Sequence, residues 1–297
     1  MHRLVAATVA AFAITLPFIR IAAAAPPPPA VTWSGYYIGG NIGYGWGDAS
    51  TDIATNWSDF TFPGLPGVPN SYALSTAHTQ KLNGVIGGGQ VGFNYQYGPK
   101  WVFGVEADFQ GTDQRRSETL DVAFKSTICN GSPGGGLCNS HAPFSGSSVT
   151  SYETRIDWFG TLRGRVGWLV TDQTLLYGTG GLAYGHVSVS GNYSLSAIVF
   201  TGVDTFGPGT GAFSASKTTF GFAVGGGIEG KFAAWLPQNW TWRLEYLYLD
   251  LGSLDASTSF VAASSNPTVY TSLTGTTTVH THFTDNIVRF GLNYEFE

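Results

Sequence analysis

The segment Asp285-Asn-Ile-Val-Arg-Phe-Gly-Leu-Asn-Tyr-Glu-Phe296 alternates strictly between apolar and polar residues from Val288 onward. One face would carry the apolar residues Val288, Phe290, Leu292, Tyr294 and Phe296. The other face would carry Arg289, Gly291, Asn293 and Glu295. Because successive side chains of a β-strand point to opposite faces, this segment predicts a strand that is apolar on one side and polar on the other.

The same alternation recurs along the chain. It predicts seven further strands, at about 35–47, 81–97, 101–110, 153–170, 174–189, 217–232 and 240–251. In the strand at 174–189, several glycines blur the alternation, so the pattern does not fix which residues face which way. With the last segment, the expectation is eight antiparallel strands.

The connections between these strands alternate in length. Those at 97–100, 171–173 and 233–239 are short, and those at 48–80, 111–152, 190–216 and 252–281 are long. An even strand number with short turns at one end and long loops at the other is typical of outer-membrane barrels. No residue in the middle of an apolar face is charged, and aromatic residues such as Trp101, Trp168 and Trp240 gather at strand ends.

These patterns predict an all-β fold. We expect an eight-stranded antiparallel up-and-down transmembrane β-barrel with short periplasmic turns and four long extracellular loops. The alternative is an all-β sandwich with a buried aromatic core.

Composition narrows the function classes. The chain has a net charge of −5, 11% charged and 14% aromatic residues, whereas a nucleic-acid-binding protein would have a basic stripe. Residues 1–25 are typical of a signal peptide that ends in a run of small alanines, and a retained N-terminal anchor is the alternative. We assign 26–34 to a proline-rich leader and 35–297 to the barrel. The expected location is the cell outer membrane.

The two cysteines, Cys129 and Cys138, lie in a Ser- and Gly-rich segment. Export to an oxidising compartment favours a disulfide between them, which would tie one loop tip. Zinc is the alternative, with His141 near, but two thiols and one imidazole are too few ligands for a structural site.

Charged residues of both signs fall on inward positions of the expected strands. They are Glu106, Asp108, Glu229, Glu245, Glu295, Arg163, Arg165, Lys231, Arg243 and Arg289. Because the interior of an eight-stranded barrel is just wide enough for side chains to fill, these charges are expected to pair and close the lumen. A narrow porin for small solutes, lined by the same charges, is the alternative.

Histidines suggest a more distant possibility. His280 and His282 share one face near Asp285, which could serve a lipid-modifying enzyme or a haem-binding surface protein. Polar residues at a solvated strand end explain them more simply, and we favour that interpretation. The sequence holds no G-x-S-x-G, no H-E-x-x-H and no phosphate-binding loop. We therefore expect no enzyme, and assign no catalytic, cofactor-binding or metal-binding residue.

Four segments carry a resemblance to a known family. They are Trp33-Ser-Gly-Tyr-Tyr-Ile-Gly-Gly-Asn-Ile-Gly-Tyr-Gly-Trp46, Gly87-Gly-Gly-Gln-Val-Gly-Phe-Asn-Tyr-Gln96, Leu175-Leu-Tyr-Gly-Thr-Gly-Gly-Leu-Ala-Tyr-Gly185 and Asn286–Phe296. Together they resemble the small outer-membrane β-barrels that include opacity-type surface antigens, porin-family proteins and the OmpA-like transmembrane barrel. The resemblance is specific for the fold and says little about activity.

The resemblance implies an assembly signal in the last strand, read by the barrel-assembly machinery. Phe290, Leu292, Tyr294 and Phe296 match that signal, whereas Glu297 departs from it by following the terminal aromatic. We expect a structural and surface protein that contributes to envelope integrity. Its expected partners are outer-membrane lipid, lipopolysaccharide and a host or surface ligand reached through the loops, but not nucleic acid.

Overall fold

The protein is described here from a computed structural model. The structure describes residues 32–58, 72–130, 140–196, 198–200, 204–232, 239–263 and 272–296. Thr32–Glu297 forms one compact unit. Among these described residues, no helix is long and apolar enough to cross a membrane. The expected signal peptide, most of the expected leader and Glu297 lie outside the described residues, as do Cys138 and the side chain of Cys129.

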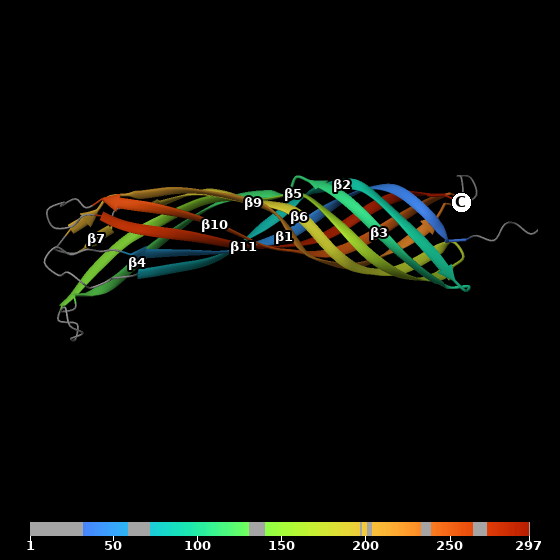
Figure 1. The fold of residues 1–297 in the computed structure, drawn as a ribbon, viewed down its shortest axis with the longest axis horizontal. Coiled ribbons are helices and arrows are strands. Elements are labelled where there is room, and N and C mark those ends of the chain that lie inside the picture. The colour runs from blue at the N-terminus through green and yellow to red at the C-terminus, as the bar shows by residue number, and fades with distance from the viewer. Residues whose placement is uncertain are drawn as a thin grey trace, which may run out of the picture. The chain divides into compact units, whose positions relative to one another are not determined.

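The described chain is built of strands (Figure 1). Their bounds are β1 Gly35–Ser58, β2 Tyr72–Tyr97, β3 Trp101–Thr112, β4 Arg115–Asn130, β5 Ser140–Thr171, β6 Thr174–Leu195, β7 Ile198–Phe200, β8 Asp204–Phe206, β9 Gly209–Lys231, β10 Trp240–Ala263 and β11 Ser272–Phe296. The strand pairs are antiparallel, including the pair between the first and last long strands, β1 and β11.

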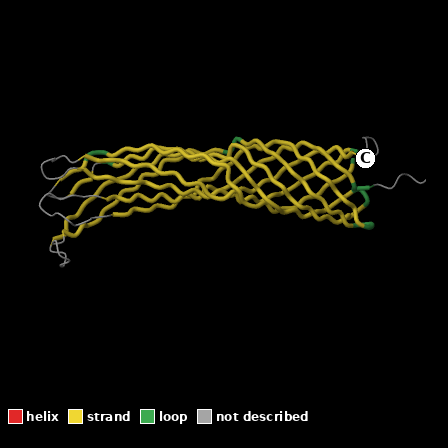
Figure 2. The backbone as a smooth tube through the Cα atoms, viewed as in Figure 1, coloured by secondary structure: helices red, strands yellow, loops and turns green. Residues whose placement is uncertain are grey.

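Eight of these strands close into a ring. The order is β3, β2, β1, β11, β10, β9, β6 and β5, and β5 pairs back onto β3. We call the level spanned by β3 the ring section. Figure 2 shows its strongly crossing strands, at the end of the molecule where Figure 1 labels β3. The turn between β2 and β3 and the end of β11 lie at the same end of this section. The eight-stranded antiparallel barrel expected from the sequence is confirmed.

Beyond the ring section the barrel divides into two sheets. The β2–β3 ladder ends at Ile86 and Thr112, and the β9–β10 ladder ends at Phe222 and Asp250. Above these points β2, β1, β11 and β10 form one sheet, and β4, β5, β6 and β9 form the other. We call this the two-sheet section. The less tilted strands of Figure 2, towards the label β7 of Figure 1, belong to it.

The two sections have different interiors. In the two-sheet section, the facing sheets bury Ile53, Val187, Leu254 and Val279, each at most 6% exposed. Each such side chain contributes about 1.5–3 kcal/mol when fully buried. Burial also raises the pKa of Tyr152 in this core to about 12, so its hydroxyl stays protonated at neutral pH. This section is held together as a sandwich core rather than as a closed barrel.

The prediction of four long loops was wrong for much of their length. Residues 48–58, 115–130, 252–263 and 272–281, among others, continue the strands. The sequence misled because the outward positions there are mostly polar, charged or small residues, which resemble loop composition. Their inward neighbours, such as Leu273 and Val279, alternate with them and fill the apolar core.

Two local irregularities redirect strands where the ring section ends. β5 shifts register between Ile156 and Trp158, and β10 shifts between Asp250 and Gly252. Gly252 has a φ of 79°, a conformation that suits glycine. The extra residue of the β5 shift is Asp157, which lies on the surface, 3.4 Å from Arg155, although strict alternation along the strand at 153–170 would turn it inward. In β6 the structure fixes what the pattern left open: Leu176 and Leu182 face outward, and Leu175 and Ala183 face inward.

Candidate functional site

The charged residues expected inside the barrel lie inside the ring section. Eight of them are at most 3% exposed, namely Glu106, Asp108, Arg163, Arg165, Glu229, Arg243, Glu245 and Arg289. Lys231 and Glu295 are partly buried at the end nearest the β2–β3 turn, where they form an ion pair. The alternation positions all of them, because every second residue of each strand points inward.

Six of the charges form a single network, which we call the lumen cluster: Glu106, Asp108, Arg163, Arg243, Glu245 and Arg289. Arg163 contacts three acids, with N–O distances of 2.6 Å to Glu106, 2.9 Å to Asp108 and 3.0 Å to Glu245. Arg289 lies 2.8 Å from Asp108 and 2.6 Å from Glu245. Arg243 forms its ion pair with Glu106, using both terminal nitrogens. Three acids therefore balance three arginines.

Arg165 and Glu229 form a further buried pair, with an N–O distance of 2.6 Å, and Arg165 links this pair to the lumen cluster through a longer contact of 3.9 Å with Glu106. Thr241 and Asn293 each donate a hydrogen bond of 2.8 Å to Glu229. The Arg165 guanidinium also lies over the Tyr177 ring, 4.0 Å from its centroid. Hydrogen bonds of this kind make a buried charge tolerable, because they replace the water that it has lost.

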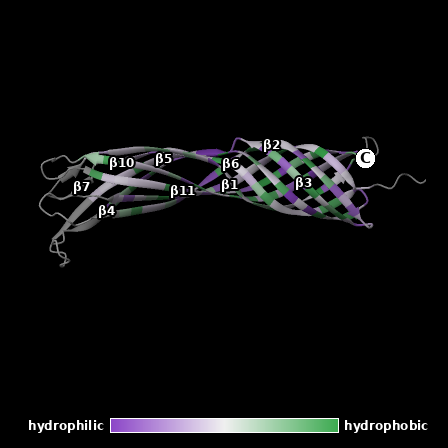
Figure 3. Ribbon diagram, in the orientation of Figure 1, coloured by the Kyte–Doolittle hydropathy of each residue, from purple (hydrophilic) through white to green (hydrophobic). Residues whose placement is uncertain are grey.

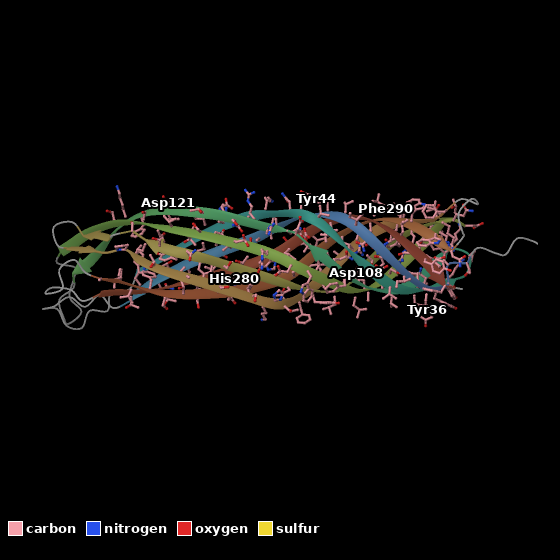
Figure 4. All side chains as sticks on the ribbon, turned by 90° about the horizontal axis from the view of Figure 1, so that it is seen from above. Tyr36, Tyr44, Asp108, Asp121, His280 and Phe290 are labelled. Carbon is pink, nitrogen blue, oxygen red and sulfur yellow. The ribbon has the colours of Figure 1, made fainter. Side chains whose placement is uncertain are left out.

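Two tyrosines take part that sequence reasoning missed. The Tyr37 hydroxyl donates to Glu106 at 2.6 Å, and the Tyr177 hydroxyl donates to Glu245 at 3.0 Å. The inward position of Tyr37 follows from the alternation of its strand. Tyr177 lies in the strand whose faces the sequence did not fix, so no sequence signal placed it. Figure 4 shows Asp108 of the same cluster within the ring section, while Tyr36 lies on the outside.

Apolar side chains fill the lumen on the side of the lumen cluster that faces the two-sheet section. Ile86, Phe159, Leu247 and Ile287 are each at most 1% exposed and belong to the same cluster as the two-sheet core. The ionic layer is therefore followed by an apolar layer within one continuous interior.

The outer surface of the ring section is apolar. Ile38, Ile42, Leu162 and Phe290 are each 46–63% exposed there. Figure 3 shows hydrophobic and hydrophilic segments alternating along the strands of this section. Aromatic residues border this surface on both sides. Trp101 packs edge-on against Trp168 near the β2–β3 turn, and Phe109 packs against Trp158 where the ring section ends. Such bands are typical of the two interfaces of a membrane.

The histidines do not form a shared site with Asp285. His280 and His282 lie on the outer face of the two-sheet section, where His280 contacts Asp255 at 2.5 Å and His282 contacts Ser253 at 3.0 Å. Asp285 points inward and is 1% exposed. The strand alternation separates it from both rings. Among the described residues, no group of three or more His, Cys, Asp or Glu is placed to hold a metal ion.

Comparisons with known proteins agree with this architecture. The model of the outer membrane protein β-barrel domain family matches residues 11–296. The 31 kDa outer-membrane immunogenic protein of Brucella melitensis is 31% identical over 275 residues, which cover 92% of this chain and 87% of that protein. The 22 kDa outer membrane protein of Rhizobium leguminosarum bv. viciae is 31% identical over 78% of this chain and 70% of its own length.

A search of solved structures finds the Ail attachment invasion locus protein of Yersinia pestis. It is 12% identical, with a TM-score of 0.32, over 84% of this chain and 99% of that one. The family match and the two relatives agree with the apolar belt, the aromatic borders and the closed ring. The chain belongs to the outer membrane protein β-barrel family, and it is an outer-membrane protein.

Proposed function

We propose that this protein is a structural and surface barrel of the outer membrane, with a lumen closed to ions and solutes. The observation that carries the proposal is the lumen cluster, in which three buried acids and three buried arginines pair across the ring. An interior of eight strands leaves room for little beyond side chains. A passing ion would have to displace these pairs inside a low-dielectric space, which is costly.

The short turns and the C-terminal end of β11 belong on the periplasmic side in this proposal. The two-sheet section would then project from the cell, because outer-membrane barrels carry their short turns inside and their longer segments outside. The name of the Brucella relative, an immunogenic protein, supports a surface role for this section. A host or surface ligand would meet the section first, while catalysis forms no part of the proposal.

The proposal extends to assembly of the barrel. Phe290, Leu292 and Phe296 present exposed apolar side chains along the last strand, together with the partly buried Tyr294. We propose that this row is the signal read by the barrel-assembly machinery. Replacing Phe296 by alanine would then lower the amount of folded protein in the outer membrane.

Single-channel conductance in a planar bilayer tests the closed lumen. The refolded wild-type protein is compared with an Arg243→Ala, Arg289→Ala variant. A Lys81→Ala, Lys125→Ala variant serves as control, because it removes two cations from the exposed surface of the two-sheet section. We expect wild type and control to be silent and the lumen variant to conduct.

Steady conductance by the wild type would contradict the closed lumen. Ion selectivity that changes in the lumen variant would then identify the narrow porin for small solutes, with the lumen cluster as its filter. Heat-modifiable migration on gels, measured for every protein, shows that each variant is folded before its conductance is compared.

A further inference from the structure

Asp285 of β11 is a buried acid that forms no ion pair within the described part of the chain. It is 1% exposed, and Gln114 donates a hydrogen bond of 3.0 Å to its Oδ1. Its second oxygen, Oδ2, has no hydrogen-bond partner among the described residues. The other buried acids of that part of the chain each pair with an arginine; they are Glu106, Asp108, Glu229 and Glu245. Asp285 is the exception among them.

Apolar side chains and a close backbone surround the Asp285 carboxyl group. Phe283 and Ile287 lie on the same inward face of β11, and Leu249 is its register partner on β10; all three are 0% exposed. On the side of β1, a Cβ added at Gly45 would lie 2.9 Å from Oδ2. Such a distance is shorter than real Cβ contacts, so no side chain fits there. The carboxyl group is therefore enclosed on these sides.

The charged groups on the strands around Asp285 have other partners. Beside Gln114, Asp113 and Arg115 are exposed. The titratable groups on inward positions of β1, β10 and β11 pair with one another or with other strands, and they are Tyr37, Arg243, Glu245, Arg289 and Glu295. Acids and histidines on the outer faces of these strands point away from the lumen, and they are Asp48, Asp52, Asp250, Asp255, His280 and His282. None of these groups compensates a charge on Asp285.

In this environment the neutral form of the carboxyl group is favoured. An ionised carboxylate that is buried without a cation costs far more free energy than a neutral carboxylic acid. The group lies just beyond the ring section, because its partner Gln114 follows Thr112, the last residue of β3, by two positions. Burial raises the pKa of Asp285 to about 7, although the hydrogen bond from Gln114 acts in the opposite direction. The ordinary pKa of aspartate is about 4.

The hydrogen bond between Asp285 and Gln114 joins the two sheets at the point where they separate. Asp285 belongs to the sheet of β2, β1, β11 and β10. Gln114 lies between the end of β3 and the start of β4, and its carbonyl oxygen accepts a hydrogen bond of 3.1 Å from the Ile156 amide of β5. It therefore belongs to the chain that enters the other sheet. We call this place the junction.

We propose that Asp285 makes the junction sensitive to pH. In the closed junction the carboxyl group keeps its proton. When the sheets separate there, water solvates the group, and the proton passes to water at the ordinary acidity of aspartate. Above about pH 4, each rise in pH then favours the open junction, until the closed junction loses its proton as well. The two-sheet section is held most firmly in acidic surroundings.

This inference goes beyond the proposed structural role and does not depend on whether the lumen is closed. Replacing Asp285 by asparagine leaves every ion pair of the lumen cluster in place. Its effect on the junction is therefore separate from the conductance result, and the failure of either proposal is recognised independently.

Opening of the junction is measured by amide hydrogen exchange with mass spectrometry, on the full chain refolded in detergent, at pH 5, 6, 7 and 8. Wild type is compared with Asp285→Asn at each pH, so the pH dependence of the exchange chemistry itself cancels. Asparagine keeps the size of the side chain and an oxygen for Gln114, but it does not ionise. Asp285→Ser is a second neutral variant in case asparagine does not fold.

The control is Asp255→Asn, which removes a carboxylate from the two-sheet section where its side chain is 72% exposed. We expect exchange in residues 115–124 of wild type, relative to Asp285→Asn, to rise about a hundredfold between pH 5 and pH 8. This follows from a pKa of about 7 in the closed junction and of about 4 in the open one. The control should follow wild type, and residues 101–110 of the ring section should show no such rise.

Infrared spectroscopy gives a readout that does not depend on opening. The spectrum of wild type minus that of Asp285→Asn should contain the C=O band of a protonated carboxyl group at pH 5, and the band should disappear as the pH rises.

Three outcomes would overturn the proposal. A ratio of exchange between wild type and Asp285→Asn that stays constant from pH 5 to pH 8 would mean that opening does not change the acidity of this group. An equal loss of pH dependence in Asp255→Asn would assign the effect to surface charge. A difference spectrum without the protonated band at pH 5 would mean that Asp285 is ionised in the closed junction.

Discussion

Replacing Glu106 by glutamine should leave Arg243 as an unpaired cation inside the ring. Among the described residues, Glu106 is the one carboxylate within 4.0 Å of Arg243. The side chains of both residues are at most 3% exposed, so water does not replace the lost partner. Breaking one side of a buried ion pair typically costs about 3–5 kcal/mol. We expect a loss of stability of this size.

The neighbouring acid gives the matched comparison. Replacing Glu245 by glutamine removes partners from Arg163 and Arg289, but both keep Asp108, at 2.9 and 2.8 Å. No arginine is then left without a carboxylate, so the loss should be that of hydrogen bonds to charged groups, about 1.5–3 kcal/mol. Both variants remove one negative charge from equally buried positions. Glu106 also lies 3.9 Å from Arg165 and 3.5 Å from Arg289, but Arg165 keeps Glu229 and Arg289 keeps Asp108 and Glu245. The larger loss expected for Glu106→Gln therefore comes mainly from the unpaired Arg243.

A double variant isolates the same effect. Combining Glu106→Gln with Arg243→Met removes the unpaired cation while keeping much of its apolar stem. The double variant should be more stable than Glu106→Gln alone, although it still lacks the contacts that Glu106 makes with Tyr37 and with the arginines Arg163, Arg165 and Arg289. Glu245 lies two residues from Arg243 in the sequence, but its ion pairs are with Arg163 and Arg289. Combining Glu245→Gln with Arg243→Met should therefore not restore stability relative to Glu245→Gln alone.

The free energy of unfolding is measured by urea titration of refolded protein in detergent, with tryptophan fluorescence as the signal. Equal stabilities of the two glutamine variants would refute the reasoning. The single variant Arg243→Met is measured as well. If the double variant loses as much stability as Glu106→Gln and Arg243→Met lose together, the reasoning is also refuted, because additivity means that the two groups do not interact.

Two further predictions concern the outer surface and the two-sheet core. Replacing Leu162 by arginine places a cation on the lipid-facing surface and should cost about 2–4 kcal/mol of barrel stability. Leu162→Ala is the control. Equal amounts of the two folded variants in outer membranes would show that this face does not meet lipid. Replacing the fully buried Phe283 by alanine should cost about 3–5 kcal/mol. Amide hydrogen exchange should then become faster in the two-sheet section and not in the ring section. Replacing the exposed Thr278 by alanine is the control and should change exchange in neither section. An equal rise of exchange in both sections of the Phe283→Ala variant would show that they unfold as one.

The fold class followed from local patterns in this chain. Alternation in 288–296 and 101–110 assigned Phe290 and Val105 outward and Arg289 and Glu106 inward, and the structure agrees. Such assignments succeed because the side-chain period of a strand is a property of the local backbone. Where glycines removed the signal, as in 174–189, the facing of Tyr177 had to come from the structure.

The structure alone decided which charges meet and where the barrel ends. Arg243 and Glu106 are 137 residues apart, and their contact depends on the closure of the ring through β3 and β5. The split into two sheets depends on ladders that stop at Thr112 and Asp250, whereas the Ser- and Thr-rich segments beyond them predict loops when read alone. Which residues share a face of a strand follows from the local backbone, so the residue pattern predicts it wherever glycines do not interrupt the alternation. Ion-pair partners and ladder ends depend on strands far apart in the chain, so they follow only from the assembled barrel.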